Sequence, residues 1–440
     1  MNYSAMGPEV QRRLSKPRYP LTSLGALAKM LQYGCSRLAT IEPVGVPMLR
    51  MNNLQANGWD LSDLKYVQLT ERELETWKLY PGDILFNRTN SKELVGKCEV
   101  FREEGDWVFA SYLMRLRVNE TQVLPAFVSD FLSTRAGRAQ IDRLSRQIVG
   151  MSNINAEEIR QLQIPLPPLS RQIELLAELD AARTARDTRL AQADELLAGI
   201  DAFVLQALGL RLPPTDALRP AYAVPRRTAL RGRNLSPDYF HPERTTAIQS
   251  IKDRYPNERS VSLRAVADFI RKVANVEPDD LYIGLANVQS NTGELIAGTE
   301  EVEGACFRFE TGDVLFARLR PYLNKVYRAE RSGVCSPEFH VIRIRGDEKK
   351  QFILDPDYLA AMLRSSAVLR QTRHMMTGNT HPRLANEDVI NLVVPIPGND
   401  VQKEIVLEVA RRRKLARVWR EEAWREWEAA KADFERALLG

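Results

Sequence analysis

The stretch that decides the fold is Gly82–Arg88, which reads GDILFNR, because it returns as GDVLFAR at Gly312–Arg318. The two copies lie 230 residues apart. The repeat units of solenoid proteins are much shorter, about 20–50 residues. The spacing therefore predicts a domain that has been duplicated together with its connector.

Two more pairs share the same offset of 230 residues. Ile164–Pro167 returns as Val394–Pro397, and Gln172 returns as Gln402. A chain with two copies of one domain is expected to address a target that itself has two parts.

Composition sets only broad limits. A chain of 440 residues is long enough for two to four domains. Hydrophobic residues make up 44% and charged residues 27%, which is typical of globular proteins. The net charge of +5 is too small to indicate nucleic-acid binding by itself, so any basic surface must be local.

Cysteine usage and the absence of apolar runs bear on location. The four cysteines are widely spaced without a CxxC pair, which argues against a structural zinc site and fits thiols in a reducing compartment. The first residues lack the apolar core of a signal peptide. No run of about 18 apolar residues occurs. We expect a cytoplasmic protein that makes no contact with membranes.

Each half of the sequence reads as a mixed globular part followed by a long helix. Short apolar runs with period-two patterning predict strands, and helical spacing predicts a helix over residues 125–139. The fold class is therefore α/β (α+β). The predicted strands are 46–51, 83–86 and 109–117 in the first part, and 281–286, 314–317 and 339–344 in the second.

The two long helices give the clearest periodic signal. Ser170 and Asp400 are good N-cap residues that follow proline-rich stops. Mostly apolar residues then recur in alternating steps of three and four from Leu176 to Ala207, and in the same phase from Val406 to Ala437. Both series also contain arginines, which are Arg183 and Arg186 in the first and Arg413 and Arg420 in the second. Such a repeat indicates a coiled-coil seam. Two unrelated surface helices are the alternative, but shared phase and caps favour a mutual, antiparallel pair.

Turn and proline signals set the predicted boundaries. Gly209 is a helix stop, and Pro213-Pro214 prevents the helix from continuing. The predicted segments are a first globular domain at 1–167, a first spacer helix at 168–208, a linker at 209–234, a second globular domain at 235–397 and a second spacer helix at 398–440.

Known catalytic motifs are missing from the sequence. It contains no GxGxxG after a strand, no GxxxxGK[ST], no amino-methyltransferase signature, and neither GxSxG nor HExxH. His374 and His381 flank a short polar loop, but no Cys, Asp or Glu stands near them at ligand spacing. We expect no catalytic residues, no metal and no cofactor.

Several segments resemble the specificity subunit of type I restriction-modification systems. The resemblance covers essentially the whole chain, in the order domain, helix, domain, helix. The second half looks like a different subtype of the same domain. The matching segments are 33–36, 46–54, 60–66, 82–91, 94–97 and 164–169 in the first half, and 312–318, 320–325 and 333–336 in the second.

The resemblance implies a non-catalytic DNA-binding subunit with two target-recognition domains and a pseudo-twofold repeat. It would read an asymmetric bipartite site in double-stranded DNA, with the paired helices fixing the gap between its parts. Its partners would be two methyltransferase (modification) subunits and, where present, an endonuclease/translocase subunit.

Forked polar side chains are what base reading requires, while other cations hold phosphates. Tryptophans beside the second seam are candidates for docking the methyltransferase. The DNA-binding candidates are Arg50, Asn52, Asn53, Arg88, Asn90 and Lys97 in the first domain and Asn287, Arg318, Arg320, Asn324 and Lys325 in the second; the docking candidates are Trp419 and Trp424.

Each candidate has a structural alternative. Arg88 and Arg318 recur with the Gly-Asp turn, so both could serve the fold. Asn52, Asn53 and Asn287 could shape turns, and the tryptophans could pack at the edge of the seam. Two rival functions also remain: a coiled-coil interaction scaffold that does not read DNA, and a self-contained nuclease or methyltransferase, against which the missing motifs argue.

Overall fold

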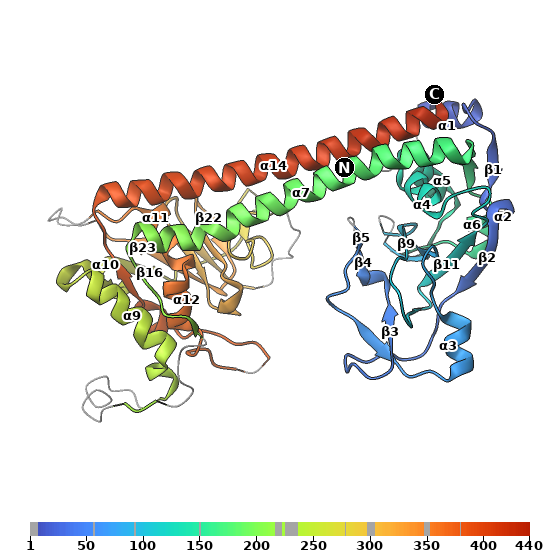
Figure 1. Ribbon diagram of the computed structural model, residues 1–440. Helices are drawn as coiled ribbons and strands as arrows, with labels where there is room; N and C mark the ends of the chain where they lie inside the picture. Colours follow the sequence, from blue (N-terminus) through green and yellow to red (C-terminus); the bar gives the residue numbers. More distant parts are fainter. Residues whose placement is uncertain are drawn as a thin grey trace. The chain divides into compact units, whose positions relative to one another are not determined.

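The computed structural model describes residues 8–55, 58–91, 94–148, 151–215, 222–224, 236–277, 279–296, 304–346, 353–378 and 380–440. The chain forms two compact units, one of residues up to Arg189 with Glu421–Gly440, the other of Leu190–Arg420. Two long helices, α7 (Leu169–Ala207) and α14 (Asn399–Leu439), contribute to both units (Figure 1). Among the described helices, none is long and apolar enough to cross a membrane.

The first unit combines short helices with small sheets. Its helices are α1 (Pro8–Ser15), α2 (Leu24–Leu27), η1 (Met51–Asn53), α3 (Glu71–Trp77), α4 (Pro125–Ser133), α5 (Arg135–Leu144) and α6 (Ala156–Arg160). Its strands are β1 (Leu21–Ser23), β2 (Ala28–Tyr33), β3 (Val46–Leu49), β4 (Leu54–Gln55), β5 (Gly58–Trp59), β6 (Lys65–Val67), β7 (Ile84–Asn87), β8 (Thr89–Asn90), β9 (Cys98–Val100), β10 (Val108–Phe109), β11 (Leu113–Val118), β12 (Arg146–Ile148), β13 (Met151–Asn153) and β14 (Gln163–Pro165).

The second unit repeats this mixture. Its helices are η3 (Asp238–Phe240), α9 (Pro242–Arg254), η4 (Asn257–Arg259), α10 (Leu263–Val266), η5 (Pro321–Leu323), α11 (Pro356–Arg364), α12 (Ser366–Thr372) and α13 (Asn386–Ile390). Its strands are β15 (Ser260–Ser262), β16 (Ala267–Ile270), β17 (Val273–Ala274), β18 (Tyr282–Ile283), β19 (Cys306–Phe309), β20 (Val314–Ala317), β21 (Val326–Arg328), β22 (Gly333–Cys335), β23 (Phe339–Ile344) and β24 (Val393–Pro395).

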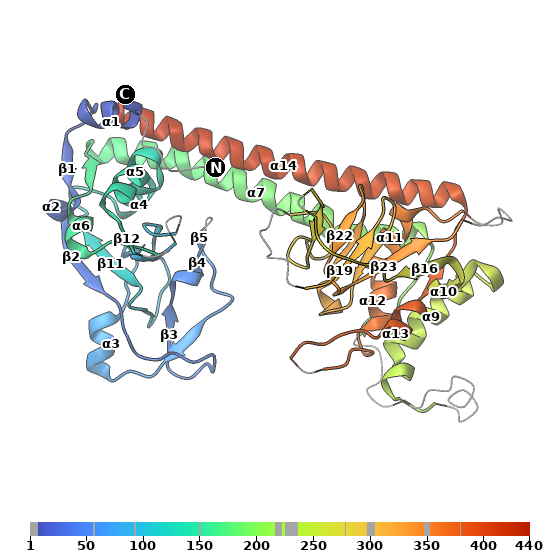
Figure 2. The same ribbon diagram turned by 180° about the vertical axis from the view of Figure 1, so that it is seen from behind.

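The two units share one sheet topology. The central sheet has the order β2-β11-β7-β9 in the first unit and β16-β23-β20-β21 in the second, where β16 and β23 are labelled in Figure 2. All neighbouring strands in both sheets are antiparallel. The strand before each helix entrance also pairs alike, as β1 with β14 and β15 with β24. The predicted duplication and mixed fold class are confirmed.

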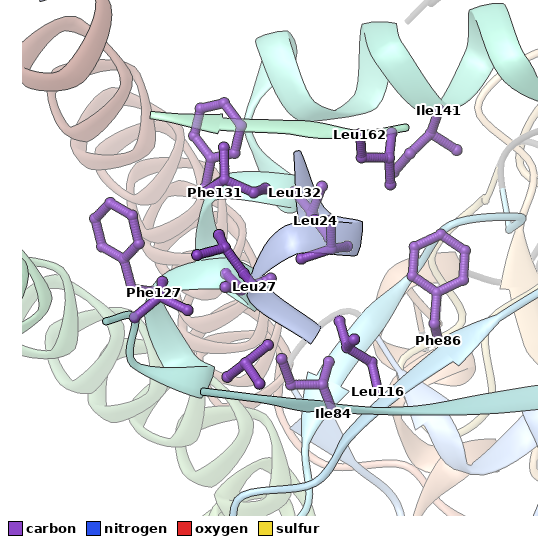
Figure 3. Packing of buried hydrophobic residues seen from close by; sticks show 14 of the residues in the cluster. Leu24, Leu27, Ile84, Phe86, Leu116, Phe127, Phe131, Leu132, Ile141 and Leu162 are labelled. Carbon is purple, nitrogen blue, oxygen red and sulfur yellow. The ribbon is translucent and has the colours of Figure 1, made fainter. Parts of the chain in front are cut away.

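The repeated strand lies at the centre of each core. Because side chains alternate along a strand, Ile84 and Phe86 face one apolar cluster while Leu85 faces another. Figure 3 shows the first cluster, in which Ile84 and Phe86 lie with Leu24 of α2 and Phe127 of α4. Burial on both faces explains why the three residues Ile84–Phe86 in the middle of the repeated stretch are all apolar.

The Gly-Asp pair recurs because it anchors that strand. Gly82 and Gly312 have φ angles of 95° and 90°, a region that glycine adopts without strain. Gly82 donates its backbone N–H to Phe101 (2.9 Å), and Gly312 donates to Ala329 (2.8 Å). These glycines therefore start the central strand in the same way in both units.

The conserved offset of Gln172 and Gln402 also has a structural cause. Gln172 accepts the Leu124 N–H (2.9 Å) and donates to the carbonyls of Gln122 (3.0 Å) and Pro167 (2.9 Å). Gln402 bonds to the corresponding backbone positions in the second unit, with distances of 2.8–3.1 Å. Each buried amide fixes the start of a long helix against the entrance of a domain helix.

The predicted seam is confirmed within each unit. In the first, Arg186 packs its guanidinium 4.7 Å from the centre of the Trp427 ring. In the second, Arg412 of α14 donates to the Gly199 carbonyl of α7 (2.8 Å), and Arg420 pairs with Asp194. Residue numbers rise along one helix as they fall along the other, so the paired segments are antiparallel.

Some predicted elements were wrong in detail. The run 109–117 is not one strand, because residues 110–112 turn between β10 and β11. The helix predicted over 125–139 is two helices, since Thr134 ends α4 and caps α5 by accepting the Gly137 N–H at 3.3 Å. Gly209 does end α7, with φ of 64°. The domain boundaries stay a prediction, and much of the linker lies outside the described residues.

Candidate nucleic-acid interface

Arg88 and Arg318 occupy the same position, immediately after the repeated strand. Their backbone N–H groups donate to Tyr112 (3.1 Å) and Glu338 (2.9 Å) respectively. Both side chains are half-buried. In each, Nε is shielded from solvent and has no hydrogen-bond partner among the described residues. The fold therefore fixes both guanidinium groups without using all their donors.

The surroundings of the two arginines differ. Arg88 lies 4.9 Å from the centre of the Tyr33 ring, within range of a cation–π contact. Its side chain donates a long hydrogen bond to the Ser111 carbonyl, at 3.4 Å. Arg318 stands 4.0 Å from the Glu338 carboxylate, which Arg383 holds more closely at 2.7 Å. The position is shared, and the chemistry around it is not.

Other candidates in the first unit have structural roles. Asn53 is buried, accepts the Arg50 N–H (2.9 Å) and donates to the carbonyls of Asp60 and Asp63. Arg50 itself bonds to the backbone and carboxylate of Asp63. Both residues therefore stabilise the loop that starts at β4, and Asn52 beside them is exposed.

Two more first-unit candidates lie near the repeated strand. Lys97 is half-buried, and its pKa is lowered by burial and then by the charge of Arg138. Asn90 lies in β8, and its side chain falls outside what the structure describes.

In the second unit, too, some candidates have structural roles and another is exposed. Asn324 is buried in a left-handed conformation and donates to the Arg364 carbonyl at 2.8 Å. Asn287 accepts the Gly284 N–H (2.8 Å) in a turn, and Lys325 donates to the Leu285 carbonyl (2.7 Å). Arg320 is exposed, and its side chain has no hydrogen bond or ion pair within the described part of the chain.

The two tryptophans lie along α14. Trp424 is 37% exposed and lies 5.4 Å from the Arg186 guanidinium, so it packs partly at the seam. Trp419 is half-buried. Docking of a partner on either side chain stays a prediction.

Sequence reasoning missed a small cavity beside Arg318. It has a volume of about 110 Å³ and is lined in part by Arg271, Arg318, His340, Asn386, Phe269 and Phe339. The pKa of His340 falls to about 4, chiefly because of burial and then because of the charges of Arg318 and Arg271. His340 sits in an apolar strand pattern, so no sequence signal distinguishes it from a core residue.

The structure also brings together three residues of metal-ligand type, which sequence spacing did not indicate. Glu243 lies 3.1 Å from His374, and the rings of His241 and His374 stack with centroids 3.4 Å apart. Arg373 contacts the same carboxylate at 3.3 Å. The ring planes are 21° apart, and His241 Nδ1 already accepts the Glu243 N–H at 3.3 Å. The carboxylate of Glu243 already has Arg373 as a cationic partner. This geometry favours a structural link between α9 and α12 over a metal site.

Comparison with curated proteins identifies relatives of one kind. The chain is 28% identical over 174 residues to the type I restriction enzyme EcoKI specificity subunit of Escherichia coli (strain K12), covering 39% of this chain and 37% of that protein. It is 24% identical over 159 residues to the putative type I restriction enzyme MjaX specificity subunit of Methanocaldococcus jannaschii, covering 36% and 37%. Each match thus spans less than half of the relative's length. No model of a protein family matches the chain.

A solved structure supports the fold over nearly the whole length. It is described as "Structural basis underlying complex assembly and conformational transition of the type I R-M system". The similarity has a TM-score of 0.51 at 15% identity and covers 96% of this chain and 98% of that one. This likeness concerns the fold alone, while over less than half of its length the chain is similar in sequence to type I restriction enzyme specificity subunits.

Proposed function

We propose that this chain is the non-catalytic, DNA-reading subunit of a type I restriction-modification complex. Each unit would read one part of a bipartite, asymmetric site in double-stranded DNA. The subunit would recruit methyltransferase subunits and, where present, an endonuclease subunit, and it would act in the cytoplasm, where its DNA substrate lies. The curated relatives support the specificity role.

The observation that carries the proposal is the pair Arg88 and Arg318. Arginine forks bind guanine edges and phosphates through several N–H donors. Both residues keep an unbonded Nε at the same place in the two units. Other arginines, such as Arg50 and Arg115, also have a buried Nε without a hydrogen-bond partner in the described part of the chain, so Arg88 and Arg318 are set apart by their shared position directly after the repeated strand.

The difference between the two sites supports asymmetry. Tyr33 covers Arg88, while Glu338 and His340 neighbour Arg318. Exposed Arg320 follows Arg318 in the second unit, whereas Asn90 stands at the matching position in the first. Two units with the same sheet topology but different polar side chains would read different base sequences, so the recognised site should not be a palindrome.

Methylation mapping tests this function directly. Genomic DNA from cells that carry the gene should contain a bipartite methylated motif that disappears when the gene is deleted. Exchanging residues 1–165 for another such domain should change one part of the motif and leave the other. Loss of no motif, or a change in both parts, would contradict the proposal.

Binding to duplex DNA separates this function from a scaffold role. A reader that contacts several phosphates releases counterions, so its affinity should fall steeply between two salt concentrations. A coiled-coil scaffold would show no duplex binding at either concentration. Cleavage or methyl transfer by the purified chain alone would instead support a self-contained enzyme.

A further inference from the structure

The cavity beside His340 has the features of a built ligand site. Its volume of about 110 Å³ lies near the about 150 Å³ that holds one benzene ring in another protein. It therefore suits a single six-membered ring better than a fused two-ring system. Phe269 is among the lining residues, and its ring lies 6.3 Å from the His340 ring, which favours a flat ligand.

Three polar atoms of the lining residues are buried and unbonded. They are His340 Nε2, Arg318 Nε and Asn386 Oδ1; none has a hydrogen-bond partner among the described residues, although Arg318 Nε lies 4.0 Å from the Glu338 carboxylate. His340 is only 5% exposed. Most buried polar groups in proteins are hydrogen-bonded, so three exceptions around one cavity indicate an absent partner.

The hydrogen-bonding character of these atoms is defined. His340 hydrogen-bonds to the Leu384 backbone through its ring, and burial keeps the imidazole neutral at pH 7 by lowering its pKa to about 4. The hydrogen bond to Leu384 raises the pKa of His340, so the ring N–H donates it, and Nε2, which has no hydrogen-bond partner among the described residues, is the acceptor nitrogen. The cavity thus offers two acceptors, from His340 and Asn386, and one donor, from Arg318.

Strand register shows that the first unit lacks this arrangement. His340 pairs with Phe316 in β20, and Met114 pairs with Phe86 in β7, where Phe86 and Phe316 are the repeated residues. His340 therefore stands where the first unit has a fully buried methionine. The cavity's polar group arose at a place where the two copies have diverged.

We propose that this cavity binds one cytosine ring of nucleic acid, taken out of the base stack. The exocyclic amine of cytosine supplies two hydrogens for the two acceptors, and its ring nitrogen accepts from arginine. Thymine offers a single N–H between two carbonyls, so it matches the two acceptors and one donor of the cavity less well. Extruding a base has precedents among DNA-acting proteins. The inference rests on the proposed DNA-reading function, since it names the ligand of one part of that surface.

Nuclear magnetic resonance of histidine side chains tests this proposal in the full chain. The sequence has four histidines, so selective labelling gives few signals, and the His340→Met spectrum identifies the one that is lost. Titration with deoxycytidine should shift the His340 signal in a saturable manner. Thymidine and deoxyadenosine should bind roughly tenfold more weakly or not at all.

Matched variants make the result specific. Asn386→Ala removes one acceptor and should abolish the shift of the His340 signal. His340→Met supplies the residue of the first unit, and it should abolish deoxycytidine binding measured by titration calorimetry. His381→Gln changes an exposed histidine and should leave binding intact. An unshifted His340 signal up to the solubility of deoxycytidine, or equal binding of deoxyadenosine, would overturn the proposal.

The outcomes distinguish this inference from the function on which it rests. Salt-dependent duplex binding without a response to deoxycytidine would leave the DNA-reading function standing and remove the cytosine site. A saturable response to deoxycytidine without any duplex binding would instead count against DNA reading.

Discussion

Arg343 holds the carboxylate of Asp313 through two hydrogen bonds of 2.8 Å, and Arg117 holds Asp83 in the same forked geometry at 2.7 and 2.8 Å. The carboxylate of Asp313 also accepts the Glu310 N–H at 2.7 Å. This pair joins neighbouring strands of the central sheet, and it explains why aspartate follows glycine in both copies of the repeat.

Breaking this pair should destabilise one unit. Asp313→Asn keeps the shape but removes the charge, so Arg343 loses its buried counterion. We expect a loss of about 2–3 kcal/mol in unfolding free energy, measured by urea denaturation of the full chain. Asp279→Asn, at an exposed position, is the control and should behave like the unaltered protein. Equal midpoints for both variants would refute the anchoring role.

Removing the buried amide at a helix entrance should have a comparable effect. Gln172→Ala leaves one backbone N–H and two carbonyls without partners in a buried region. A loss of about 3 kcal/mol is expected, visible as a lower thermal unfolding midpoint. Gln161→Ala, whose side chain is exposed, should change little. If the two variants unfold alike, water must replace the amide at no cost.

Substituting Arg88 should separate base contact from phosphate contact. If its fork binds a phosphate, Arg88→Ala should reduce the salt dependence of duplex binding by about one counterion, and Arg88→Lys should largely restore it. If the fork reads a base, Arg88→Lys should fail as well, because an ammonium cannot donate in the forked geometry. An Arg88→Ala variant with unchanged affinity and methylation motif would show that Arg88 serves the fold alone.

Acid should destabilise the second unit through His340. Its pKa is about 4 in the folded chain and near 6.5 when unfolded, so the unfolded chain binds the extra proton between these values. Stability is therefore complete above pH 6.5 and falls as the pH drops toward 4, by at most about 3 kcal/mol. Urea midpoints from pH 7 to pH 5 should fall less for His340→Met than for the unaltered protein. Parallel curves would show that His340 remains accessible to protons.

Part of the candidate site could be predicted from the sequence, because residues that recur at the offset of the repeat occupy equivalent positions in the two units. The offset between Arg88 and Arg318 picked out two residues that the structure places alike. Asn53 and Asn324 could not be judged, since an asparagine that shapes a turn and one that reads a base look the same in a sequence. Their burial and backbone bonds give them structural roles.

The sequence by itself determined the duplication, the mixed fold and the phase of both long helices. These follow from periodic apolar patterns and local stop signals, which depend on near neighbours along the chain. Only the tertiary structure decided that Arg343 would meet Asp313, that Glu243 would meet His374, and that His340 would line a cavity with Asn386. Such contacts depend on strand order and loop paths. Those features bring together residues that no local pattern links.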